Sequence, residues 1–173
     1  MDDRMIMLLL RLIHIVGGVL WVGAAALMTA FVAPAVRSAG AQGGRVMQEL
    51  VQRRRLPVYM NAVAGLTMLS GLAMYGLLAA KTDGAWAGTL PGMAFGFGGV
   101  AAVLAAVIGG AVVGPAGRKL AALGERVQAT GGPPSAEQAA QMQALQARMG
   151  RTMRVVVLLL LVAVAAMAIA RYL

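Results

Sequence analysis

Four long apolar stretches dominate this chain and restrict it to one class of fold. They cover about residues 5–33, 56–80, 90–114 and 153–172. Each approaches or exceeds the ~20 residues that an α-helix needs to cross a bilayer. Of the 173 residues, 60% are hydrophobic and 12% are charged, whereas soluble domains carry about 25% charged residues. We therefore predict an all-α, polytopic membrane protein, with one four-transmembrane-helix bundle over residues 1–173.

Eleven of the 15 basic residues lie in the first and third connections between these stretches. Short loops rich in Lys and Arg stay on the cytoplasmic side, so we expect a bacterial inner (cytoplasmic) membrane protein with both termini outside. Anionic membrane lipids are the expected partners of the basic loops. Nucleic acid is not an expected partner, because no aromatic residues interleave with the cations. The cations of the two loops are Arg37, Arg45, Arg53, Arg54, Arg55, Arg118, Lys119, Arg126, Arg148, Arg151 and Arg154.

Local signals refine the expected helices. Pro34 is expected to end the first helix, and Pro57 fits the first turn of the second. Residues 115–152 predict helical extensions of the third and fourth spans that pair as a cytoplasmic hairpin, broken by "TGGPP". Ser135 opens "SAEQ", a capping-box pattern completed by Gln138.

Two GxxxG patterns, Gly92/Gly96 and Gly110/Gly114, provide small faces in the third span. Such faces let helix backbones approach closely in lipid. They are compatible with packing inside one bundle, with a homodimer, or with a larger membrane complex.

The only histidine, His14, lies inside the first apolar stretch. It is about nine residues past Met5, a depth of about 13 Å at 1.5 Å per residue. Ionisable residues at such a depth usually face a bundle interior or a cavity. At helical spacing it belongs to a stripe of Met7, Arg11, His14, Gly18, Trp21, Ala25 and Met28.

Several roles for His14 follow from this stripe. As an axial ligand of haem, it would use its neutral imidazole to bind iron, with Gly18 leaving room for the porphyrin and Arg11 pairing with a propionate. As a copper ligand, it would combine with some of the 13 scattered methionines. A proton-transfer role would need membrane carboxylates, but every Asp and Glu lies in a tail or loop. The remaining reading is a neutral histidine that hydrogen-bonds to a neighbouring helix.

The stretch "LLLRLIHIVGGVLWVGAAALMTAFVAPAVR" resembles the first span of a group of bacterial four-span membrane families. They share an L-H-x(4)-V-x-W-x-G-like first helix, and the group includes the copper-resistance D-like proteins, the HemJ-like protoporphyrinogen oxidases and related uncharacterised integral membrane proteins. The resemblance covers about thirty residues. It implies b-type haem at His14 for the HemJ-like branch, or copper uptake for the copper-resistance D-like branch.

The second axial position on a haem at His14 has three candidate solutions. Methionines at matching depth in the second and fourth spans are Met74 and Met167. A second chain could offer its own His14 on a two-fold axis. The third solution is five-coordinate iron with a site open to a small ligand.

We therefore expect a small b-type haem-binding membrane protein, resembling a cytochrome b, for electron transfer or haem handling, with His14 as the metal ligand. The alternative is a non-catalytic accessory or assembly subunit of a larger respiratory or photosynthetic complex, and copper transport is a third possibility. Asn61, Thr67 and Ser70 are expected to make hydrogen bonds between helices. The sequence contains no assembly of nucleophile and base from which an enzymatic reaction could be predicted.

Overall fold

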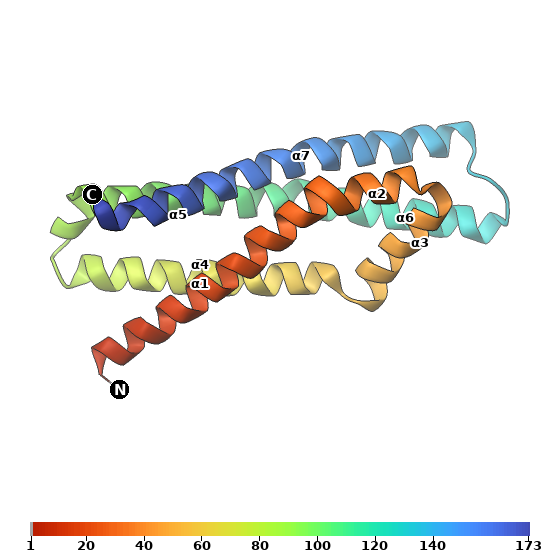
Figure 1. The fold of residues 1–173 in the computed structure, drawn as a ribbon. Coiled ribbons are helices and arrows are strands. Elements are labelled where there is room, and N and C mark those ends of the chain that lie inside the picture. The colour runs from red at the N-terminus through yellow and green to blue at the C-terminus, as the bar shows by residue number, and fades with distance from the viewer. Residues whose placement is uncertain (1) are drawn as a thin grey trace.

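The computed structural model describes residues 2–173, apart from the side chain of Ala41. It contains four long helical rods and, over these residues, no strand (Figure 1). All four rods are long and apolar enough to cross a membrane, which confirms an all-α, four-helix, multi-pass membrane bundle. The rods are α1 (Asp3–Leu27) continued by η1 (Met28–Val32) and α2 (Ala33–Ser38); α4 (Leu56–Ala80); α5 (Leu90–Ile108) continued by η4 (Gly109–Val113) and α6 (Gly114–Thr130); and α7 (Ala136–Ile169) continued by η5 (Ala170–Tyr172).

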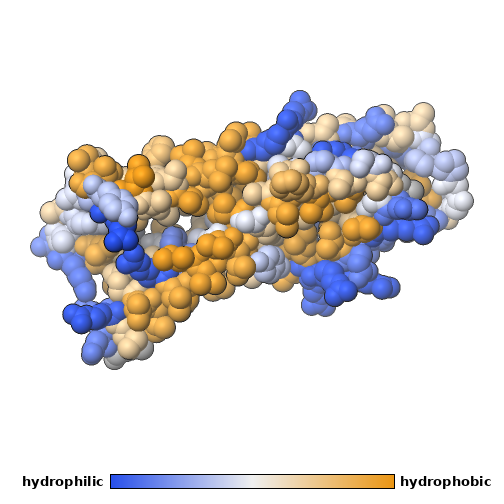
Figure 2. Space-filling model, viewed as in Figure 1, coloured by the Kyte–Doolittle hydropathy of each residue, from blue (hydrophilic) through white to orange (hydrophobic). Residues whose placement is uncertain are grey.

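The two termini lie at the same end of the bundle (Figure 1). The short helix η3 (Ala85–Gly88), which joins α4 to α5, lies at that end too. There the ammonium of Lys81 lies 2.9 Å from the carboxylate of Asp3 and ties the start of α1 to the end of α4. The opposite end carries α3 (Gly40–Gln48), η2 (Glu49–Arg53) and the α6–α7 hairpin. Apolar residues cover the middle of the molecule, and hydrophilic residues gather toward its ends (Figure 2).

The helices pack as two antiparallel pairs, α1 with α4 and α5 with α7. Helix α1 crosses α4 obliquely, and its C-terminal part approaches α7 (Figure 1). All four rods contribute to the buried core, which forms where α1 reaches the second pair. Its members are Trp21, Ala25, Val63, Ala105, Val156 and Leu160. Toward the end that holds the termini the two pairs diverge, and Figure 2 shows gaps there between the pairs.

Pro34 does not end the first helix, so that expectation is wrong. The helix continues to Ser38 through the π-helical turn η1. The N–H of Ala33 bonds to the carbonyl of Met28, which is the wider spacing of a π-helix. Pro34 then falls in the first turn of α2, where its missing N–H is tolerated.

The structure has a helical hairpin over residues 115–152, with α6 packed against α7. Ser135 caps α7 in the expected capping box: its Oγ accepts from the N–H of Gln138 at 3.2 Å, and the Gln138 side chain accepts from the Ser135 N–H at 2.9 Å. Helix α6 ends at Thr130, and Gly131 after it has a φ of 65°, a left-handed conformation that glycine adopts most readily. Pro57 lies in the first turn of α4, as expected. Helix α7 is unbroken for 34 residues, so the hairpin and the fourth span form one rod.

Candidate functional site

The helices α1 and α4 approach each other closely at Gly17. A Cβ atom at Gly17 would lie 2.6 Å from Oγ1 of Thr67 and 3.5 Å from the carbonyl oxygen of Val63. The absent side chain therefore permits the crossing, as small residues do between helices in lipid. The Thr67 hydroxyl itself donates to the Val63 carbonyl at 2.7 Å, within its own helix. It therefore contributes packing, and no side-chain hydrogen bond, to the crossing.

His14 lies one turn from Gly17 and inserts its ring beside Gly71 of α4. A Cβ atom at Gly71 would lie 2.7 Å from Cε1 and 2.9 Å from Nδ1 of the imidazole. Only a residue without a side chain leaves this space for the ring. From here, Nδ1 lies 2.7 Å from the carbonyl oxygen of Thr67. His14 is thus held to α4 by a short hydrogen bond and by contact with a glycine backbone.

The chemistry of the Thr67 carbonyl fixes the tautomer of His14. A carbonyl oxygen only accepts hydrogen bonds, so Nδ1 must carry the hydrogen and donate it. In the neutral ring Nε2 then holds a lone pair. Nε2 makes no hydrogen bond to any residue between positions 2 and 173, and it is not a fully buried atom without a partner. The half-buried imidazole therefore presents an available lone pair inside the membrane-spanning part of α1.

The carbonyl of Thr67 serves two side chains. It accepts from the Ser70 hydroxyl at 3.1 Å as well as from His14 at 2.7 Å. The Ser70 hydroxyl also donates to the Leu66 carbonyl at 2.6 Å. Ser70 is buried, so one backbone carbonyl of α4 accepts hydrogen bonds from a buried hydroxyl and from the imidazole of α1.

The other predicted site residues fall in different places. Arg11 is exposed, one turn from His14 toward the N-terminus. Gly18 does not face open space, because a Cβ there would lie 3.6 Å from Cγ2 of Thr67. Met74 is half-buried on α4, one turn beyond Gly71.

Met167 belongs to the other helix pair. Its Cγ and Cε lie 3.0 and 3.3 Å from the Cβ position of Gly98, between α7 and α5. The structure thus brings His14 together with α4 and places Met167 in the α5–α7 interface. Asn61 is exposed and has no hydrogen-bonding partner among the described residues.

The residues that hold the imidazole are only partly visible in the sequence. Thr67 was expected to make a hydrogen bond between helices, but its backbone carbonyl, rather than its hydroxyl, receives His14. Gly17 and Gly71 were not identified. The four-residue spacing of Thr67 and Gly71, which places them on one helix face, is the signal that points to them.

Two further observations bear on what this site can hold. No cluster of three or more His, Cys, Asp or Glu residues that could hold a metal ion occurs in the part of the chain that the structure describes. The grooves at the loop end of the molecule, of about 500 Å³ between α6 and α7 and about 350 Å³ along η2, lie away from His14. A metal at His14 would therefore have one imidazole and non-protein, methionine or partner-chain ligands.

Comparison with family models, with curated proteins and with solved structures found no match. The function of the site is therefore inferred from its geometry.

Proposed function

We propose that the protein binds b-type haem through Nε2 of His14 and serves electron transfer or haem handling in the membrane. The observation that carries this proposal is the hydrogen bond from Nδ1 of His14 to the Thr67 carbonyl. Metal-binding histidines commonly donate their second ring N–H to a carbonyl or carboxylate, which sets the tautomer and the ring orientation. The same bond leaves Nε2 as the ligating atom.

The surroundings of His14 fit a single axial ligand. Gly71 leaves the space in which the ring lies against α4, so little reorientation of the imidazole accompanies haem binding. Arg11 lies three residues earlier on the same face of α1, and its exposed guanidinium is available to a propionate. Because Thr67 occupies the space beside Gly18, the macrocycle is not expected to lie against Gly18. When bound, haem supplies a one-electron redox centre.

Candidates for the second axial ligand remain Met74, Met167, His14 of a second chain, or none. Met74 is the better placed of the two methionines. It lies on α4 one turn beyond Gly71, in the helix whose Thr67 carbonyl bonds to His14. Met167 would have to leave its contact with Gly98. A copper site at His14 would depend on the same methionines. The resemblance of the first span to the HemJ-like and copper-resistance D-like families agrees with either metal.

We also propose that the end with the α6–α7 hairpin is cytoplasmic and that both termini lie outside, in a bacterial inner membrane. The basic residues of the α1–α4 and α5–α7 connections support this orientation. At the opposite end, Lys81 is already paired with Asp3.

A second candidate function is that of an accessory subunit in a larger membrane complex. Cβ positions at Gly65, Gly76, Gly99 and Gly109 have nothing within 4 Å. These small residues on two rods offer close-approach surfaces that the bundle itself does not use.

The absorption spectrum of the detergent-purified protein, expressed with ample haem, tests the proposal. His14→Ala should abolish the Soret band. His14→Asn is the sharper variant, because its amide nitrogen can replace Nδ1 as donor to the Thr67 carbonyl while the Nε2 ligand is lost. We expect His14→Asn to keep the fold and lose the Soret band. A colourless wild-type protein, or a band that survives His14→Asn, would rule out haem at His14 and leave the accessory role.

A further inference from the structure

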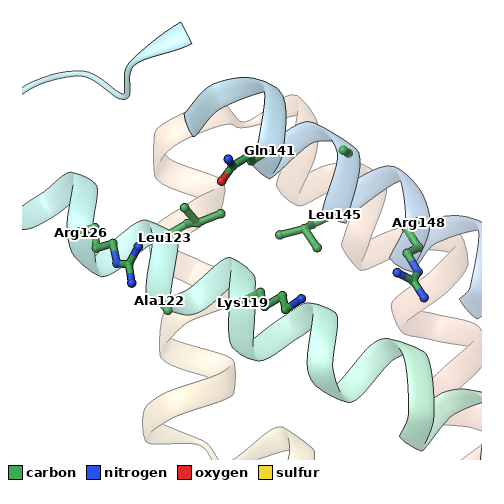
Figure 3. Close-up of a pocket in the computed structure, with 8 residues that line it drawn as sticks. Lys119, Ala122, Leu123, Arg126, Gln141, Leu145 and Arg148 are labelled. Atoms are coloured by element: carbon green, nitrogen blue, oxygen red, sulfur yellow. The ribbon is translucent and has the colours of Figure 1, made fainter. Parts of the chain in front are cut away.

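An open groove of about 500 Å³ lies between α6 and α7 in the hairpin. Leu123 and Leu145 face each other between the helices, and cationic side chains lie at both ends of the groove (Figure 3). Lys119 of α6 and Arg148 of α7 are at the end nearer the membrane-spanning segments, and Arg126 is at the hairpin tip. The groove thus has an apolar middle and a pair of cations at its membrane end.

None of these three cations has an acidic partner. The ion pairs found between positions 2 and 173 join Glu49 with its neighbouring arginines and Lys81 with Asp3. The carboxylates on the hairpin itself belong to Glu125 and Glu137, and each accepts a hydrogen bond from a glutamine. Glu137 lies 11 residues, about 16 Å along α7, from Arg148. Charge complementarity therefore favours an anion at the Lys119–Arg148 end.

The position of this end along the helices indicates which anion can reach it. Lys119 is five residues beyond Gly114 and Arg148 is five residues before Met153, which are the expected limits of the spans. Five helical residues correspond to about 7.5 Å. The headgroup layer extends about 5–7.5 Å beyond the hydrocarbon core on each side. Lys119 and Arg148 therefore lie at the level of lipid phosphates, whereas Arg126 lies about 18 Å beyond Gly114.

We propose that this groove is a binding site for one anionic phospholipid of the adjacent leaflet. Its phosphodiester lies between Lys119 and Arg148, at the membrane end of the groove. The two cations come from different helices, so the lipid joins α6 to α7 at the membrane surface. The site is separate from His14 and does not depend on a metal there.

Binding of phosphatidylglycerol to the detergent-purified full chain, measured by native mass spectrometry with phosphatidylcholine as reference, tests the site. Lys119→Gln with Arg148→Gln should weaken phosphatidylglycerol binding about 30-fold, from about 1 kcal/mol for each cation near a membrane surface. The matched control is Arg118→Gln with Arg151→Gln, which removes the same charge at nearly the same level but outside the groove lining. It should weaken binding distinctly less than the groove variant does, because neither Arg118 nor Arg151 lines the groove.

Four outcomes would overturn the proposal. Equal losses in the two double variants would mean general attraction to a basic surface, and no loss in either would exclude the groove. Binding of glycerophosphate or of an RNA oligonucleotide as tight as that of the lipid would assign the groove to a soluble anion. Lys119→Arg with Arg148→Lys keeps both charges and should retain binding, so a loss in the glutamine variant that this variant shares would reflect an altered hairpin and overturn the proposal.

Discussion

The imidazole of His14 fills the space into which a side chain at Gly71 would project. This relationship makes a glycine of α4 a requirement for the orientation of a histidine on α1. It also connects the packing of the first helix pair with the chemistry proposed at Nε2.

Gly71→Ala should displace the imidazole, because the new methyl group would lie 2.7 Å from Cε1. The α4 backbone cannot easily yield, so we expect a loss of about 1–3 kcal/mol in stability, as for overpacked interiors. Thermal unfolding in detergent measures this change. Gly76→Ala on the same helix meets nothing within 4 Å and should stay within about 0.5 kcal/mol of wild type. Equal stabilities for the two variants would contradict the placement of His14.

Adjacent glycines of α1 should respond differently to the same substitution. Gly17→Ala brings a methyl group to 2.6 Å from Oγ1 of Thr67, whereas Gly18→Ala brings one only to 3.6 Å from Cγ2. We expect a destabilisation of about 1–3 kcal/mol for Gly17→Ala and little change for Gly18→Ala. If the wild type binds haem, a stable Gly18→Ala protein without haem would show that the porphyrin lies against Gly18 after all. Greater damage from Gly18→Ala to the fold itself would mean that α1 is rotated relative to the structure.

How far the sequence predicts this molecule depends on the range of each interaction. The four spans, the capping box at Ser135 and the first-turn position of Pro57 follow from patterns within one helix, and the structure confirms them. Pro34 was mispredicted because a π-helical turn before it absorbs the mismatch, and such a turn has no clear sequence signature.

The arrangement around His14 could not be predicted from the sequence to the same extent. The stripe on α1 identified His14 and Gly18, but the register between α1 and α4 decides that Gly17, rather than Gly18, makes the closest approach. Depth counting selected Met74 and Met167 together. Counting residues along each helix does not tell which helices pair. In the structure Met74 lies on α4, which pairs with α1, and Met167 lies on α7, which pairs with α5.

The orientation in the membrane can be tested because the chain has no cysteine. A single cysteine introduced by Lys81→Cys should react with a membrane-impermeant maleimide in intact cells. One introduced by Gln146→Cys, on the exposed part of the hairpin, should react only after lysis. Mass spectrometry or a gel shift reports the labelling. The reverse pattern would place the termini in the cytoplasm.

Leu160 should be the most sensitive leucine of α7. Its side chain is 1% exposed, whereas that of Leu158 is 63% exposed. Leu160→Ala leaves a void among packed helices, and we expect a loss of about 2 kcal/mol, the lower end of the range for buried leucines, because lipid is as apolar as the core. Leu158→Ala should unfold near the wild-type temperature. If the two substitutions were equally disruptive, the core would not lie where α1 meets the second helix pair.

The unbroken course of α7 has a mechanical consequence. A helix of 34 residues is about 51 Å long, well over the ~30 Å of a hydrocarbon core. The helix is therefore expected to move as one rigid body about its buried residues Val156, Leu160 and Ala163. A tilt of the hairpin at one membrane surface is then expected to displace Ala170 at the other surface, because no break in the helix lies between them.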